Sequence, residues 1–291
     1  MTHVYAWQFD VRSYELDALG HVNNAVYNNY MEEAATRASA EAGFGREWYF
    51  RQHRAWVVRH MAIRYLAPLH YGEQVEMRTW VSDFRRIYSH REYDLRRVED
   101  GQPVMRGRAR WVYVDLDTIR PVRIPAEFEA PFDPSGEMED LGIRLKGAQS
   151  YPDSYRYTST RRVQRYELDS AGHVNNSVYL NWFEQAMYDA LVHSGWTVDR
   201  LLEAGIAMVQ AGHEIDYVMP AMEGMPLRIV SQPIELARVR GAWQHEIQHA
   251  ETGDVIARDY SVGAFLDARS GRPTPLPEDF LASLLSGQPA A

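Results

Sequence analysis

The chain has 291 residues, of which 45% are hydrophobic and 24% are charged, and it contains no cysteine. The absence of cysteine excludes disulfides, thiol nucleophiles and cysteine-ligated metal sites. A formal net charge of −9 argues against a nucleic-acid binder whose affinity rests on neutralising phosphates. The length allows one large domain or two domains of about 140 residues each.

The N-terminal segment MTHVYAWQFD has no basic region followed by an apolar region, so the sequence predicts no signal peptide. No window approaches the run of about 18 apolar residues that a membrane span needs. We therefore expect a cytoplasmic protein that does not enter a membrane.

One segment of the chain occurs twice. Residues 14–24 read YELDALGHVNN and residues 166–176 read YELDSAGHVNN, so nine of eleven positions are identical at an offset of 152. Further pairs share this offset: Gly72 with Gly224, Asp115 with Asp267, and Phe128 with Phe280. The pattern predicts a duplicated domain with pseudo-two-fold symmetry. We expect an N-terminal domain over 1–130, a linker rich in Pro, Gly, Ser and acidic residues over 131–154, and a C-terminal domain over 155–291.

The order of elements within each half follows from hydrophobic periodicity. A strand is expected over 5–14, with its copy over 155–166, and the repeated motif follows as a loop. From 24 to 42, apolar residues recur at helical spacing in two rows: Val26, Tyr30, Ala34, and Tyr27, Met31, Ala35, Ala38. Asn23 or Asn24 is the expected N-cap and Gly43 the expected stop. Strands are expected over 56–65, 73–81, 89–97 and 104–116. The fold class is therefore α+β, with two domains that each wrap an antiparallel sheet around one long central helix.

The loop Asp-x-x-Gly-His-Val-Asn-Asn before a long helix resembles that of the hotdog-fold thioesterases. Within that fold it is similar to two groups, the 4-hydroxybenzoyl-CoA thioesterase-like enzymes and the acyl-ACP thioesterases. The resemblance covers residues 3–130 and 155–283. It implies two hotdog domains that pair as an internal pseudo-dimer, and it leaves a further homo-oligomer open.

The resemblance also implies roles for motif residues. Asp17 and Asp169 match the nucleophile or general base of the 4-hydroxybenzoyl-CoA type, and amides near Asn24 and Asn176 match its contact to the thioester oxygen. His21 and His173 match the histidine of the plant acyl-ACP enzymes. The asparagine that these plant enzymes carry two residues before the histidine is replaced by Leu19 and Ala171. This departure shifts the expected chemistry to the aspartates.

The residues themselves favour the same chemistry. Thioester hydrolysis needs a water or carboxylate aimed at the carbonyl carbon and a positive site for the oxyanion. A helix N-terminus offers unpaired N–H groups and partial positive charge, and an aspartate lies a few residues upstream. No G-x-S-x-G segment is present. The catalytic candidates are Asp17, Asp169, His21 and His173, and the substrate-binding candidates are Gly20, Asn23, Asn24, Gly172, Asn175 and Asn176.

Structural roles compete with these functional ones. Aspartate is common in turns, asparagine is common at N-caps, glycine permits positive φ, and the histidines could hold the loop in shape. Glu32 and Glu184 also recur on the helix, where a surface ion pair or support of a catalytic residue is as good an explanation as catalysis itself. Arginine clusters at 85–86, 96–97, 106–110 and 161–162 are either solvated strand faces or sites for the phosphates of coenzyme A or an acidic carrier protein.

The sequence therefore predicts an acyl thioesterase of fatty-acid metabolism, acting on acyl-CoA or acyl-ACP without a cofactor or metal. Two alternatives remain open: a hotdog-fold enoyl hydratase or dehydratase, and a non-catalytic module that binds acyl thioesters. We expect no metal site, although residues 245–249 read HEIQH and match the HExxH spacing. We expect no nucleic acid among its partners.

Overall fold

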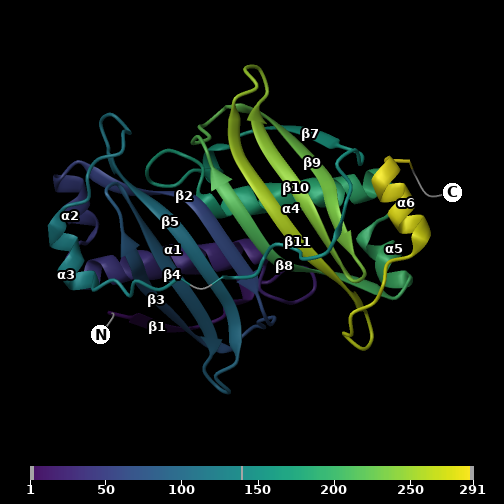
Figure 1. Cartoon of the computed structure of the whole chain (residues 1–291), viewed down its shortest axis with the longest axis horizontal. Helices are drawn as coiled ribbons and strands as arrows, with labels where there is room; N and C mark the ends of the chain where they lie inside the picture. Colours follow the sequence, from purple (N-terminus) through teal and green to yellow (C-terminus); the bar gives the residue numbers. More distant parts are fainter. Residues whose placement is uncertain (1–2, 139, 289–291) are drawn as a thin grey trace. The chain divides into compact units, whose positions relative to one another are not determined.

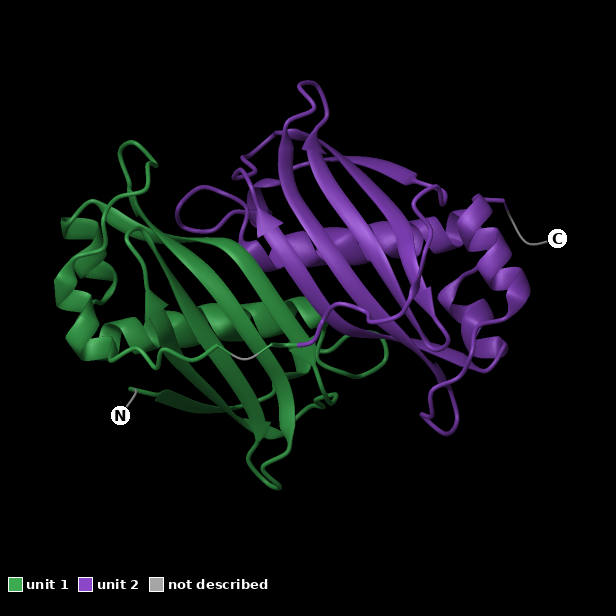
Figure 2. Ribbon diagram, viewed as in Figure 1, with its two compact units in different colours: residues 1–141 green, residues 142–291 purple. Residues whose placement is uncertain are grey.

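The computed structural model describes residues 3–138 and 140–288. The chain divides into two units, residues 1–141 and 142–291 (Figure 2). In each unit a long helix lies along one face of an antiparallel sheet, α1 in the first and α4 in the second (Figure 1).

The described part of unit 1 contains five strands. They are β1 (Tyr5–Asp10), β2 (Arg54–Tyr65), β3 (Gln74–Phe84), β4 (Tyr88–Arg97) and β5 (Pro103–Asp115). Their order in the sheet is β1-β3-β4-β5-β2, and every pair in it is antiparallel. The helices of this unit are α1 (Asn24–Glu41), α2 (Arg46–Arg51) and α3 (Glu129–Phe132), with short 3₁₀ turns η1 (Ser13–Glu15) and η2 (Ala126–Phe128).

Unit 2 repeats this plan. Its strands are β6 (Gln149–Ser150), β7 (Tyr157–Arg162), β8 (Ile206–Tyr217), β9 (Pro226–Ala237), β10 (Arg240–His249) and β11 (Val255–Asp267). The sheet runs β8-β11-β10-β9, and both β6 and β7 pair with β9. The helices are α4 (Asn176–His193), α5 (Val198–Glu203) and α6 (Glu278–Ser286), and η3 (Arg165–Glu167) precedes the motif loop.

The apolar rows of the helix pack as periodicity predicts. Met31, Ala34 and Ala38 in α1 are almost fully buried. A Cβ atom placed on Gly107 of β5 would lie only 2.8 Å from Cε of Met31. The glycine therefore allows α1 to approach the sheet closely at this point.

The structure differs from the sequence predictions just before each motif loop. The first strand of each unit ends earlier than expected, at Asp10 and Arg162, and a 3₁₀ turn follows. Tyr14 and Tyr166, which the sequence analysis placed in these strands, are 81% and 84% exposed. The strand ends because a buried glutamate side chain binds the chain at this position, as described below. The short helices α2, α3, α5 and α6 were not predicted.

Within the described residues, no helix is both long enough and apolar enough to cross a membrane.

Candidate active site

The motif loop of unit 1 is organised around the carboxylate of Asp17. Its Oδ1 accepts hydrogen bonds from the backbone N–H groups of Leu19 (2.8 Å) and His21 (3.1 Å). The backbone of Asp17 closes the same turn, since its N–H donates to His21 (2.7 Å) and its C=O accepts from Gly20 (3.1 Å). Gly20 has φ +80°, which confirms the predicted need for glycine at this position. Across residues 3–138 and 140–288, no group donates to Oδ2 of Asp17.

The loop of unit 2 has nearly the same geometry. Oδ1 of Asp169 accepts from the N–H of Ala171 at 2.8 Å, and Gly172 has φ +83°. One contact differs, because Nδ1 of His173 lies 3.9 Å from Oδ1 of Asp169. Leu19 and Ala171 thus contribute their main-chain N–H groups to the aspartates. Both aspartates therefore form the turn through Oδ1, and the second carboxylate oxygen, Oδ2, remains available to a substrate or a water molecule.

Each loop leads directly into the N-terminus of the long helix. Asn23 and Asn175 are the N-caps, and their side chains accept from Ala25 and Ser177, both at 2.9 Å. The first helical residues are therefore Asn24 and Asn176. In the described part of the chain, the N–H of Asn176 donates no hydrogen bond, so it remains available to an oxyanion.

A buried glutamate, which sequence analysis did not select, fastens each loop. The Glu15 carboxylate accepts from the N–H of Arg12 (2.7 Å), from its guanidinium (2.8 Å) and from the hydroxyl of Tyr30 (2.7 Å). The backbone C=O of Glu15 accepts from Asn23 at 2.9 Å, which ties the turn to the helix cap.

Glu167 does the same in unit 2. Its carboxylate accepts from the N–H of Gln164 (2.8 Å), from Nε1 of Trp182 (3.1 Å) and from the guanidinium of Arg161. The repetition of Tyr-Glu-Leu-Asp was the signal that could have revealed both glutamates.

A buried tyrosine lies near each aspartate. Burial, together with the charge of Asp169, raises the pKa of Tyr179 to about 12, and its hydroxyl accepts from the N–H of Ala221 at 3.0 Å. Burial and the charges of Glu73 and Asp17 raise the pKa of Tyr27 in unit 1. Both tyrosines therefore stay neutral at physiological pH.

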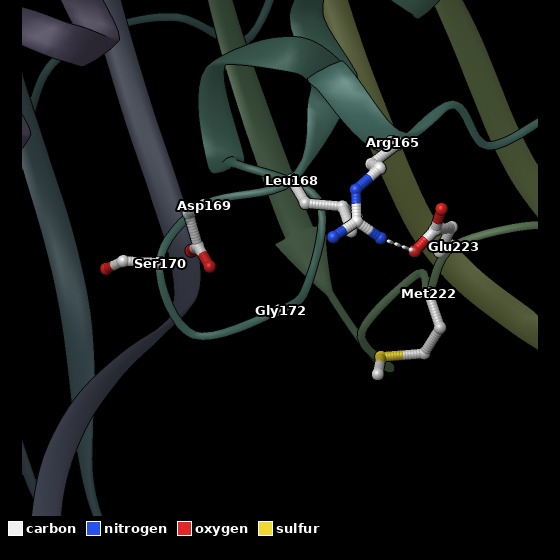
Figure 3. A pocket seen from close by; sticks show the side chains of 7 residues that line it. All are labelled: Arg165, Leu168, Asp169, Ser170, Gly172, Met222 and Glu223. Carbon is white, nitrogen blue, oxygen red and sulfur yellow. Dashed lines mark hydrogen bonds and ion pairs between the residues drawn. The ribbon is translucent and has the colours of Figure 1, made fainter.

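The loop of unit 2 borders a pocket of about 530 Å³ (Figure 3). Asp169, Gly172 and Met222 line it, and an exposed ion pair between Arg165 and Glu223 (2.9 Å) lies at its side. The carboxylate of Asp169 and this ion pair are therefore accessible from the same open space.

The structure brings the candidate residues of each motif together in one loop and helix start. The arginines at 106–110 lie elsewhere, on the sheet face away from the helix, and they alternate along β5 with buried Gly107 and Ala109, which face the helix. Arg108 pairs there with Glu92 at 2.7 Å, and both side chains of this pair are largely buried, so the pair is not part of a solvated strand face.

Residues 11–132 and 163–284 both match the family model of the thioesterase-like superfamily. The chain belongs to this superfamily. Two matches in one chain also confirm that the domain is duplicated.

The chain is also similar to curated proteins that are named as acyl-ACP thioesterases or hydrolases. The acyl-[acyl-carrier-protein] hydrolase FATB2, chloroplastic, of Cuphea viscosissima is 29% identical over 192 residues, which are 62% of this chain and 46% of the relative. The oleoyl-acyl carrier protein thioesterase 2, chloroplastic, of Arabidopsis thaliana is 25% identical over 202 residues, covering 65% of this chain and 55% of the relative. The chain thus spans about half the length of these relatives.

The 12:0-ACP thioesterase from Umbellularia californica has a similar structure, with a TM-score of 0.69 at 20% identity, covering 89% of this chain and 93% of that one. An acyl-ACP thioesterase from Bacteroides thetaiotaomicron gives a TM-score of 0.68 at 18% identity, covering 89% and 97%. These likenesses confirm the predicted hotdog fold.

Proposed function

We propose that the protein hydrolyses acyl thioesters, with Asp17 and Asp169 as the carboxylates of two separate sites. The observation that carries this proposal is the hydrogen bonding of each aspartate carboxylate. One oxygen is held by loop amides while the other accepts no hydrogen bond from a described residue, and the same loop ends at a helix N-terminus. The names of the relatives support the same reaction class.

In the proposed reaction the carboxylate takes a proton from water as the water oxygen attacks the thioester carbon. The negative charge that develops on the carbonyl oxygen is stabilised by the first amides of the helix, at Asn24 and Asn176. The C–S bond then breaks, and the proton passes from the carboxyl group to the leaving thiolate. The products are a free acid and a free thiol, and the aspartate is regenerated. In a second route, the carboxylate attacks the thioester carbon and expels the thiolate, and water then hydrolyses the resulting mixed anhydride to the free acid and the aspartate.

The leaving thiol is proposed to be phosphopantetheine, the chemistry that coenzyme A and acyl carrier protein share. The relatives are named for acyl carrier protein, and this favours the carrier protein as the natural donor.

A panel of short, long and aromatic acyl groups on both carriers tests the proposal, with free thiol as the readout. We expect release by the wild type and its loss in the double variant Asp17→Asn, Asp169→Asn. No release from any member of the panel would contradict the proposed function, and turnover only on coenzyme A would contradict the choice of carrier.

A further inference from the structure

The interior of unit 1 contains an arginine that lacks a carboxylate partner. Arg91 in β4 is only 7% exposed. In the described ranges 3–138 and 140–288, its guanidinium makes one hydrogen bond, a long one of 3.4 Å to Oγ1 of Thr79. Its Cζ atom also lies 5.4 Å from the ring centre of Phe132. Burial lowers the pKa of Arg91, because no charged partner offsets the loss of water.

Neighbouring groups do not satisfy the guanidinium. The tyrosines that act electrostatically on the guanidinium are Tyr49 and Tyr93, and the hydroxyl of each is already in a hydrogen bond. The Tyr49 hydroxyl accepts from Nε1 of Trp56 at 3.0 Å and bonds Ser39 at 2.8 Å, while the Tyr93 hydroxyl accepts from Nε1 of Trp111 at 3.4 Å. A buried cation with unused donors is costly unless something pairs with it.

The duplicated unit shows that the fold does not need this charge. The position 152 residues later is Trp243, which is 5% exposed and packs in an apolar cluster with Phe265 and Phe280. Unit 2 thus has an uncharged aromatic side chain at the position that Arg91 occupies in unit 1.

A second polar side chain in unit 1 points to the same conclusion. Asn28 in α1 is 1% exposed, and neither its Nδ2 nor its Oδ1 has a partner among the described residues. Its counterpart in unit 2 is Leu180, which is equally buried. Unit 1 therefore carries unpaired polar groups at two positions where unit 2 is apolar, and this difference indicates a ligand with polar groups.

The position of Arg91 sets the length of that ligand. Its neighbour Tyr49 bonds Ser39 near the end of α1, whereas the proposed oxyanion amide is at Asn24. Fifteen helical residues separate these points, about 22 Å at the rise of an α-helix. Only a long acyl group could reach from one to the other.

Building on the proposed function, we propose that Arg91 binds a carboxylate at the far end of a long acyl group, so that unit 1 accepts thioesters of long dicarboxylic acids. A guanidinium matches a carboxylate with two parallel N–H donors, and this geometry accounts for arginine in an otherwise aromatic interior.

Paired substrates test the proposal. Hydrolysis of hexadecanedioyl-CoA is compared with that of palmitoyl-CoA, which has the same length and ends in a methyl group. We expect Arg91→Met to lower kcat/KM for the dicarboxylic substrate by about 10- to 100-fold, the scale of a charged hydrogen bond, and to leave palmitoyl hydrolysis unchanged or faster. Arg91→Lys keeps the charge but not the bidentate geometry, so a several-fold loss is expected. Glutaryl-CoA, which is too short to reach Arg91, should respond to neither change.

Arg96→Met is the matched control, since Arg96 is on the same strand but is partly exposed and paired with Asp94 at 2.7 Å. It should leave both activities unchanged. An equal effect of Arg91→Met on both long substrates, or no effect on either, would overturn the proposal. If Arg91→Met does not fold, the ratio of the two activities in Arg91→Lys decides, and an unchanged ratio overturns it.

A binding measurement separates this inference from the proposed function. Free hexadecanedioate should raise the melting temperature of the wild type and of Arg96→Met, but not of Arg91→Met or, to the same extent, Arg91→Lys. If the wild type hydrolyses no thioester, the proposed function fails while this measurement still decides the role of Arg91. If thioesters are hydrolysed but hexadecanedioate gives no protection, only the inference on Arg91 fails.

Discussion

The two motif loops are nearly identical, whereas the two interiors behind them differ. Both loops hold an aspartate by backbone amides, place a glycine at positive φ, and end in an asparagine cap. On the helix side of the sheets, however, unit 1 has Met61, Tyr93 and Gly107 where unit 2 has His213, His245 and Asp259. The geometry of the loop is therefore shared, and the interior behind it is specific to each unit.

Unit 2 buries a row of hydrogen-bonded polar side chains across four strands. Nδ1 of His213 lies 2.9 Å from Oδ2 of Asp259, while Nδ1 of His245 lies 2.8 Å from Oγ of Ser231 and its Nε2 lies 3.2 Å from Oγ of Ser261. His213, His245 and Asp259 are each no more than 2% exposed. Such a row stabilises the unit only while each side chain keeps its protonation state, because a changed proton count breaks hydrogen bonds that are buried away from water.

The largest difference between the units should therefore appear on acidification. Burial lowers the pKa of His245 from 6.5 to about 4. The unfolded chain binds this proton at higher pH than the folded chain, so stability is fully present above pH 6.5 and falls as the pH drops toward 4. The expected loss from this one group is about 3 kcal/mol.

Urea unfolding at pH 7.5 and pH 4.5, followed through the folding transition of unit 2, measures this loss. His245→Gln should remove most of the pH dependence, whereas His3→Gln, a change of a partly exposed histidine in unit 1, should leave it intact. An unchanged pH dependence in His245→Gln would show that the row in unit 2 does not set its acid sensitivity.

The buried glutamates should have equal effects in both units. Glu167→Gln weakens the contact to Arg161 and the hydrogen bonds that fasten the loop, so unfolding should become easier by about 2 kcal/mol. Glu15→Gln should destabilise unit 1 by a similar amount. Chemical denaturation measures both, and Glu223→Gln, at an exposed ion pair beside the pocket, is the control that should change stability little. A large effect in one unit only would break the equivalence of the two loops.

The smallest expected effect comes from the loop glycines. Gly20→Ala and Gly172→Ala force an L-residue to φ near +80°, and each should destabilise its unit by about 1 kcal/mol although neither new methyl group meets a neighbour within 4 Å. Gly263→Ala, where the added carbon makes only ordinary contacts, should be neutral. Thermal melting distinguishes these variants, and a neutral result at Gly20 or Gly172 would show that the loop can relax.

The sequence was most informative where it repeated itself. The duplication, the long helix beginning at Asn24 and its buried row could all be predicted, because these depend on local spacing. Arg91 could have been suspected, since it shares strand parity with Tyr93 and Leu95, both buried. Asp259 and His213 could not, because their pairing joins strands that are distant in sequence. The role of Glu15 also depends on contacts with Tyr30 and Asn23 that only the fold supplies.

The central claim is that each motif aspartate drives its own reaction, and replacing the two aspartates separately and together tests it most directly. Asparagine forms the same kind of turn, so Asp17→Asn and Asp169→Asn should retain the loop while they remove the base. We expect each single variant to keep the activity of the other site, measured as kcat/KM on palmitoyl thioesters, and the double variant to fall by about 100-fold or more. If one single variant loses as much activity as the double variant while its melting temperature is unchanged, the two sites are coupled or only one is active, and the account of two separate sites is wrong.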